Sequence, residues 1–154
     1  MADRKTKDRI LDAALASFAT RGYEATSLDA MAKGLELTKQ SILYWFPSKD
    51  VLLEAVIARS ATDLSEALES ALERAGEGWD RVEAVVRSVF RLAARQPDLL
   101  GLLREVGRLG PPAATQMTLA LEPLVGRASS FLEAEMDAGA MRRHDPRLLL
   151  LAIY

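Results

Sequence analysis

The segment from Thr26 to Lys49 constrains the fold of this chain most, because it holds two short helical patterns separated by only a few residues. In the first pattern, apolar residues recur at helical spacing: Leu28, Met31, Ala32 and Leu35. Thr26 and Asp29 form a predicted capping pair at its start. A second helix can begin at Thr38 as N-cap and run to Phe46, where Pro47 stops it. This is the helix-turn-helix plan, in which the second helix lies in the major groove of DNA.

The two sides of the predicted second helix differ in chemistry. With about 3.6 residues per turn, one side gathers residues that we expect to pack inward: Thr38, Ile42, Trp45 and Phe46. The opposite side presents Gln40 and Tyr44, flanked by Ser41 and Leu43. Gln can pair with adenine, Ser with several bases, Tyr with a phosphate and Leu with a thymine methyl group. An exposed Tyr beside an exposed Leu favours contact with a partner over an ordinary solvated face.

Positive charge is local rather than global. The net charge is −2, and residues 1–50 hold eight Lys or Arg against seven Asp or Glu. The predicted second helix, which we call the reading helix, has Lys39 at its start and Lys49 just past its end. Both lysines are suited to phosphate contacts. The chain also opens with a basic run of Arg4, Lys5, Lys7 and Arg9. We leave open whether this run contacts DNA or only solubilises the chain.

The composition is that of a folded globular protein. With 154 residues, 49% of them hydrophobic, the chain can form one domain plus a small module. It has no Cys, so it offers neither disulfides nor thiolate metal sites, and we expect no metal and no cofactor. The N-terminus lacks a signal-peptide core and no apolar run reaches membrane-spanning length. We therefore expect no membrane association and a cytoplasmic location.

The apolar pattern is helical almost throughout, which predicts an all-α fold. A first helix ends near Arg21, with Gly22 as its stop. A long connecting helix covers about residues 48–74, begins at Ser48 and ends before Gly76 and Gly78. Further helices are predicted over residues 82–93, 99–106 and 113–138, the last with a kink at Pro123, and a final one starts with Asp145 and Pro146. The closing run LLLLAIY has no stop signal, so we expect burial on several sides and a natural protein that continues.

The first 57 or so residues resemble the DNA-binding domain of the tetracycline-repressor (TetR) family of bacterial regulators. The match lies in register, at Phe18, Gly22, Tyr23, Thr26, Ser27, Met31, Ala32, Leu37, Thr38, Lys39, Ile42, Phe46, Pro47, Ser48, Lys49 and Leu52. Four positions depart from the family pattern: Leu35 and Glu36 replace Ala-Gly in the turn, Gln40 replaces Gly, and Leu43 replaces Tyr. Glu36 then needs a backbone conformation that Gly adopts more cheaply.

The resemblance implies an all-helical homodimer that binds double-stranded DNA at a near-palindromic operator. It implies a helix-turn-helix DNA-binding domain over residues 1–50 and an effector-binding and dimerisation domain over residues 51–154. We carry over Thr38, Lys39, Ser41 and Lys49 as DNA contacts from the family. From the residues themselves we add Thr26, Ser27, Gln40, Leu43 and Tyr44.

A repressor released by a small hydrophobic or amphipathic effector is the function that this architecture favours. The candidate effector pocket is apolar and consists of Phe90, Leu103, Met117, Leu121 and Phe131, although residues of this kind are more often plain core. We expect the long helix after Ser48 to link this pocket to the helix-turn-helix domain of residues 1–50, which we call the reading head.

Two other classes of function explain the sequence less well. An enzyme is disfavoured because the chain has no Cys and a single His144, in a polar loop, and lacks the Glu-x-x-His pairs of helical di-iron sites. A helical adaptor that binds protein through its N-terminal helices is the alternative function. It does not explain why Gln40, Ser41 and Tyr44 share a face with lysines at the helix ends.

Overall fold

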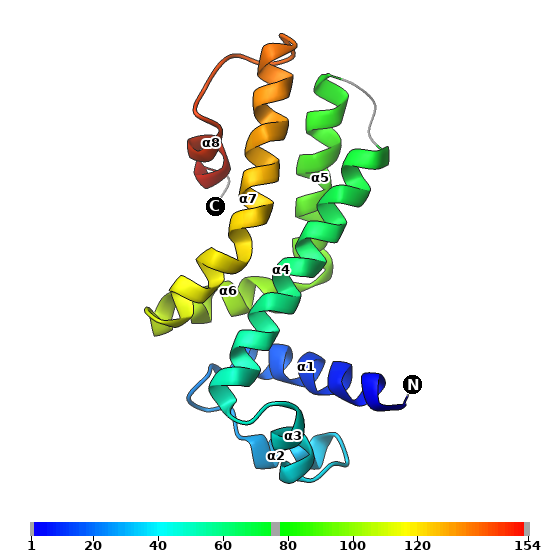
Figure 1. Cartoon of the computed structure of the whole chain (residues 1–154), viewed down its shortest axis with the longest axis vertical. Helices are drawn as coiled ribbons and strands as arrows, with labels where there is room; N and C mark the ends of the chain where they lie inside the picture. The colour runs from blue at the N-terminus through cyan, green and yellow to red at the C-terminus, as the bar shows by residue number, and fades with distance from the viewer. Residues whose placement is uncertain (1, 75–77, 153–154) are drawn as a thin grey trace. The chain divides into compact units, whose positions relative to one another are not determined.

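The computed structural model describes residues 2–74 and 78–152, and each regular element within those ranges is an α-helix (Figure 1). The all-α prediction is thus confirmed. The predicted helix breaker Gly76 and the last residues of the LLLLAIY run, Ile153 and Tyr154, lie outside the described residues. The side chains of Val89, Leu150 and Leu151 lie outside them too, so the predicted burial of the leucine run is described only for Leu148, which is 64% exposed, and Leu149.

The first compact unit comprises Met1–Ser60 and Gln96–Met117. It contains α1 (Ala2–Arg21), α2 (Leu28–Gly34), α3 (Lys39–Trp45), the start of α4 (Lys49–Arg74), α6 (Pro97–Leu109) and the start of α7 (Ala113–Asp137). Its centre consists of side chains with almost no exposed surface: Ile10, Ala14, Phe18, Ile42, Leu52, Val56 and Leu102. Three of them, Ile10, Ala14 and Phe18, recur at helical spacing in α1, so one face of the first helix forms part of this core.

The second unit comprises Ala61–Arg95 and Thr118–Tyr154. It contains the remainder of α4 and α7 together with α5 (Trp79–Arg95) and α8 (Pro146–Ala152). These units do not follow the predicted division at residue 50, because α6 packs on α1 and so joins the N-terminal helices in one compact body. The division into a DNA-binding and an effector-binding domain stays a prediction about function.

Most predicted helix ends are confirmed by their caps. Gly22 follows α1 with a φ of 84°, and Thr38 caps α3 by accepting a hydrogen bond from the Ser41 N–H. The Ser48 hydroxyl accepts from the Val51 N–H at the start of α4. At α8, the Asp145 carboxylate accepts from the N–H groups of Arg147 and Leu148.

Three local expectations need correction or stay open. The predicted capping pair of Thr26 and Asp29 is wrong, because Ser27 is the N-cap of α2 and accepts from the Ala30 N–H. The helix predicted from residue 99 starts earlier, because Pro97 opens α6, where its missing N–H costs nothing. The helix α7 continues through Pro123, and the kink predicted there stays a prediction.

Candidate nucleic-acid interface and ligand cavity

The turn between α2 and α3 is closed by a pair of backbone hydrogen bonds. The Glu36 N–H donates to the Lys33 carbonyl at 3.2 Å and the Leu37 N–H to the Ala32 carbonyl at 2.9 Å. This is the Schellman arrangement, which places the residue after the helix cap in the left-handed region. That residue is Glu36, with a φ of 58°. The expectation that Glu36 adopts a conformation better suited to Gly is therefore confirmed.

The inward and outward sides of α3 lie largely as predicted. Ile42 and Phe46 are 0% and 2% exposed, whereas Tyr44 is 78% exposed. Gln40 is exposed, while Ser41, Leu43 and Trp45 are half-buried, and the Trp45 ring meets the Tyr44 ring edge-on at 5.4 Å. Thr38 is an exposed cap rather than an inward residue. The surface of α3 is thus available to a partner at Gln40 and Tyr44, with Ser41 and Leu43 at its margins.

Thr26 and Ser27, both predicted as DNA contacts, differ in placement. Ser27 is exposed, with its hydroxyl at the α2 N-terminus. Thr26 is 4% exposed; its hydroxyl donates to the Gly22 carbonyl at 2.8 Å and lies 3.0 Å from the Ser17 hydroxyl. The predicted DNA contact of Thr26 is corrected on this ground, because its side chain faces α1 and supports the loop.

The two lysines that flank the reading helix, Lys39 in the first turn of α3 and Lys49 at the start of α4, have partners within the protein. The Lys39 ammonium lies 2.8 Å from the Asp29 carboxylate, in an ion pair that is exposed on both sides. The Lys49 ammonium donates to the carbonyls of Tyr23 at 2.9 Å and Thr26 at 3.2 Å, and lies 4.3 Å from the centre of the Tyr23 ring. Lys39 can exchange a weak surface partner for a phosphate, whereas Lys49 holds the loop before α2 against the start of α4.

The basic run at the N-terminus includes one residue with a structural role. The Arg9 guanidinium donates to the carbonyl of Leu35, in the turn between α2 and α3, at 2.9 Å. Arg4, Lys5 and Lys7 are exposed on α1. Sequence patterns could not have paired Arg9 with the turn, because the contact joins residues of different helices.

A polar network behind the reading head was missed by sequence reasoning. The Glu105 carboxylate, 8% exposed, accepts from the Tyr23 N–H at 2.6 Å and from Arg108 at 2.7 and 2.8 Å. The hydrogen bonds from Arg108 lower the pKa of Glu105, and burial opposes them. The Tyr23 hydroxyl donates to Asp50 at 2.5 Å; burial, then this bond, raises the pKa of Tyr23 to about 12. The network thus links α6 through Tyr23 to the first turn of α4.

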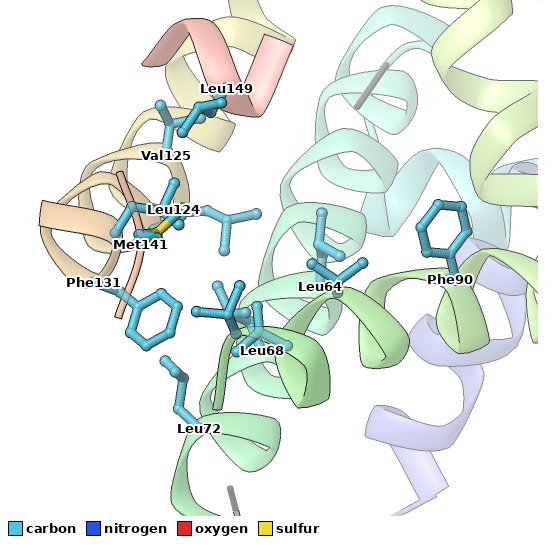
Figure 2. Close-up of a pocket in the computed structure, with 14 residues that line it drawn as sticks. Leu64, Leu68, Leu72, Phe90, Leu124, Val125, Phe131, Met141 and Leu149 are labelled. Atoms are coloured by element: carbon cyan, nitrogen blue, oxygen red, sulfur yellow. The ribbon is translucent and has the colours of Figure 1, made fainter. Parts of the chain in front are cut away.

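The second unit encloses an apolar cavity of about 420 Å³ (Figure 2). All fourteen lining residues are hydrophobic: Leu64, Leu68 and Leu72 of α4, Val82, Val85, Val86 and Phe90 of α5, Leu124, Val125, Ala128, Phe131 and Leu132 of α7, with Met141 and Leu149. This volume lies within the range of about 300–1,000 Å³ typical of small-molecule sites. A cavity without polar lining can accept only the apolar part of a ligand.

Two of the five predicted pocket residues line this cavity. Phe90 and Phe131 do so, and Figure 2 shows them on opposite sides of the group. Leu121 is half-buried but does not line it. Leu103 and Met117 belong to the other compact unit, where Met117 is 8% exposed and part of the core. The prediction that these three residues line the pocket is therefore wrong. The apolar residues that recur at helical spacing in α4 and α5 are the sequence signal that could have identified the other lining residues.

Among the described residues, no three His, Cys, Asp or Glu side chains gather in a group that could hold a metal ion. In the same part of the chain, every helix is too short or too polar to cross a lipid bilayer.

Comparison with known proteins relates the reading head to a family. Residues 10–56 match the family model described as "Bacterial regulatory proteins, tetR family". The HTH-type transcriptional regulator RutR of Escherichia coli (strain K12) is 26% identical over 149 residues, which are 96% of this chain and 70% of RutR. The matched range contains the whole α2–turn–α3 segment. RutR is a regulator, which agrees with the prediction that this chain is not an enzyme.

Solved structures show the same fold over most of the chain. FadR of Bacillus subtilis, determined with stearoyl-CoA, superposes with a TM-score of 0.82 at 19% identity and covers 94% of this chain and 79% of its own. AibR, determined with isovaleryl coenzyme A and operator DNA, gives a TM-score of 0.79 at 21% identity, with 96% and 80% covered. At these identities the likeness shows the fold alone.

Proposed function

Since the chain belongs to the TetR family of bacterial transcriptional regulators, we propose that it is a repressor that binds a near-palindromic operator as a homodimer and leaves it when a small apolar or amphipathic effector binds. The observation that carries the DNA-binding half is the outward face of α3. Tyr44 is 78% exposed and Gln40 is exposed beside it, on a short helix that follows a closed turn.

An exposed aromatic ring on this face favours contact with a partner. A tyrosine ring exposed to solvent gains little for stability, whereas in a major groove its hydroxyl can bond a phosphate while Gln40 reads a base edge. We propose that Gln40, Ser41, Leu43 and Tyr44 face the bases and the nearby backbone, and that Thr38, Ser27 and Lys39 bind phosphates. The ammonium of Lys49 is held by two carbonyls, so we assign it to positioning the loop rather than to a free phosphate contact.

The cavity of the second unit supports the effector half of the proposal. Its entirely apolar lining fits an alkyl or acyl group. FadR and AibR, which share the fold, were determined with acyl-CoA esters. We propose an effector of this amphipathic type, acting in the cytoplasm where the chromosome lies.

Effector and operator must favour different arrangements of the dimer for release to occur. Two reading helices of a dimer reach successive major grooves when they lie about 34–36 Å apart. An effector changes operator affinity only to the extent that it prefers one spacing over the other. We propose α4 as the lever, because this single helix begins beside the reading head and supplies Leu64, Leu68 and Leu72 to the cavity.

Selection of bound fragments from bacterial genomic DNA by the full-length protein tests the DNA-binding half. We expect a near-palindromic motif, with affinity that falls steeply with salt. Gln40→Ala should relax preference at one base pair by about 1–3 kcal/mol, and Lys39→Gln should reduce the salt slope by about one. Gln96→Ala, an exposed glutamine without a side-chain capping bond, is the matched control and should change neither.

The same experiment separates the regulator from the helical adaptor. An adaptor would recover no motif and would show no log-linear dependence of DNA affinity on salt. If Gln40→Ala and Lys39→Gln both bind DNA like the unaltered protein, the outward face of α3 is not the reading surface.

A further inference from the structure

One charged side chain lies at the edge of the apolar cavity. Arg81, in the first turn of α5, places its guanidinium carbon 5.3 Å from the centre of the Phe131 ring, and Phe131 lines the cavity. Val82, the next residue of α5, lines it as well. Arg81 therefore lies against one of the residues that form the cavity wall.

The hydrogen-bonding capacity of Arg81 is largely unused within the described residues. Its Nε atom is shielded from solvent and has no hydrogen-bond partner. Its Nη1 atom lies 3.7 Å from the Glu135 carboxylate, which is too long for a hydrogen bond. A guanidinium carries five N–H donors arranged to bind carboxylate or phosphate oxygens, so Arg81 keeps donors that its long contact with Glu135 does not use.

The two side chains of the Arg81–Glu135 pair differ in exposure, and only the exposed one is accessible to a ligand. The Arg81 side chain is 40% exposed, whereas the Glu135 side chain is 7% exposed and shielded. The neighbouring acid Asp80 precedes Arg81 on the helix and so points to a different side. Of this pair, the exposed charge is therefore the positive one.

The cavity extends away from Arg81 along α5. From Val82 to Phe90 the helix rises about 12 Å, at about 1.5 Å per residue. The lining over this length is hydrophobic throughout, and Phe90 is 61% exposed at the other end. An alkyl chain can occupy this length, whereas a second polar group would find no partner in the lining.

We propose that the effector is an alkyl-chain amphiphile whose anionic head binds Arg81 and whose tail lies along α5 toward Phe90. This inference rests on the proposed function, because it specifies the effector of the same cavity. The anionic head can be the carboxylate of a free fatty acid or a phosphate of an acyl-CoA ester, since both offer the oxygens that a guanidinium binds.

The test is calorimetric titration of the full chain with three probes that share a tail: dodecanoate, dodecanoyl-CoA and dodecanol. We expect at least one anionic probe to bind about tenfold or more tightly than the alcohol. Arg81→Gln should remove that preference while leaving dodecanol affinity unchanged, which also shows that the variant is folded. Arg81→Lys should restore part of the preference, and Glu135→Gln should tighten binding of the anion because it removes a competing carboxylate.

Arg87→Gln is the matched control, because it removes the same charge from the same helix at a residue that pairs with Glu83 and does not line the cavity. It should leave the preference intact. Equal affinity for dodecanol and both anions, or an anion affinity insensitive to Arg81→Gln, would overturn the role of Arg81 while leaving an apolar effector in place. Failure of all three probes to bind would overturn the proposed apolar effector itself.

Discussion

The Glu105 carboxylate of α6 accepts a hydrogen bond of 2.6 Å from the backbone N–H of Tyr23, 82 residues earlier in the chain. The same carboxylate is held by Arg108 one helical turn further on. This N–H is partly buried and needs a partner, and here that partner is charged. Glu105 thus fixes the loop between α1 and α2 to α6.

Replacing Glu105 should therefore be costly. We expect Glu105→Ala to lower the free energy of unfolding by about 1.5–3 kcal/mol, because it leaves the Tyr23 N–H without its acceptor. Glu105→Gln retains an acceptor and should cost less. Urea unfolding measures both; Glu133→Gln, at an exposed residue of α7, should stay within about 0.5 kcal/mol. An equal loss for Glu105→Ala and Glu133→Gln would contradict the contact.

Lowering the pH should show how much the charge on Glu105 contributes to the stability of the fold. Its pKa in the folded protein lies below the ordinary value of 4.5, chiefly because of the Arg108 hydrogen bonds. The stabilisation is present above the pKa of the unfolded chain and is lost as the pH falls through the lowered pKa. We expect the stability difference between the unaltered protein and Glu105→Gln to shrink as the pH falls below 4.5, as followed by urea unfolding at each pH. A constant difference would mean that the charge contributes nothing.

Tyr23 should respond at the opposite end of the pH scale. Its pKa is raised from 10 to about 12, first by burial and then by the hydrogen bond to Asp50. The stabilisation is complete below pH 10 and is lost as the pH rises toward 12, because the unfolded chain ionises first. Tyr23→Phe should lower the free energy of unfolding by about 1–2 kcal/mol at neutral pH. It should also reduce the further decrease in this free energy as the pH rises toward 12. Tyr44→Phe, at a residue 78% exposed, should keep it.

Local sequence signals predicted what is local in this structure. Thr38, Ser48, Asp145 and Gly22 were each identified as helix ends from residue type and position, since a cap satisfies backbone groups within a few residues. Glu36 was identified as a strained turn residue from the resemblance, because the family pattern has Gly at that position. The exception is Thr26, where two adjacent hydroxyl residues could each cap α2 and tertiary packing against Ser17 decided for Ser27.

Contacts between helices could not be predicted in the same way. Apolar periodicity shows which face of a helix is buried but not which neighbour covers it. Met117 and Phe131 share the apolar side of α7, yet one packs in the core of the first unit and the other lines the cavity. No sequence pattern pairs Glu105 with Tyr23, because neither segment contains a motif that predicts contact with the other.

The turn residue Glu36 offers a stabilising substitution. A non-glycine residue in the left-handed region costs about 1–2 kcal/mol. Glycine avoids this cost, but part of the gain is lost because glycine has more conformational freedom in the unfolded chain. We expect Glu36→Gly to raise the free energy of unfolding by about 0.5–1 kcal/mol, whereas Glu36→Ala keeps the φ of 58° and should not. Both remove a carboxylate near the proposed DNA phosphates, so both should tighten DNA binding equally. An equal stability gain for Ala and Gly would show that charge, not backbone conformation, matters here.

The approach of α6 to α1 depends on Gly101. A Cβ atom at this position would lie 2.7 Å from the Cβ and 2.9 Å from the carbonyl oxygen of Ala19. Gly101→Ala should therefore force the two helices apart and lower stability by about 1–3 kcal/mol. Gly107→Ala is the matched control on the same helix, because a Cβ there meets nothing within 4 Å. It should raise stability by about 0.5–1 kcal/mol through helix propensity.

A double substitution separates this close contact from any general intolerance of α6 to change. Ala19→Gly removes the nearer Cβ but leaves the backbone oxygen, so it should rescue Gly101→Ala only in part. The coupling between the two positions is measured by urea unfolding of both single variants and the double variant. Additive effects at Ala19 and Gly101 would contradict the contact, and a Gly101→Ala protein as stable as Gly107→Ala would show that the two helices do not pack this closely.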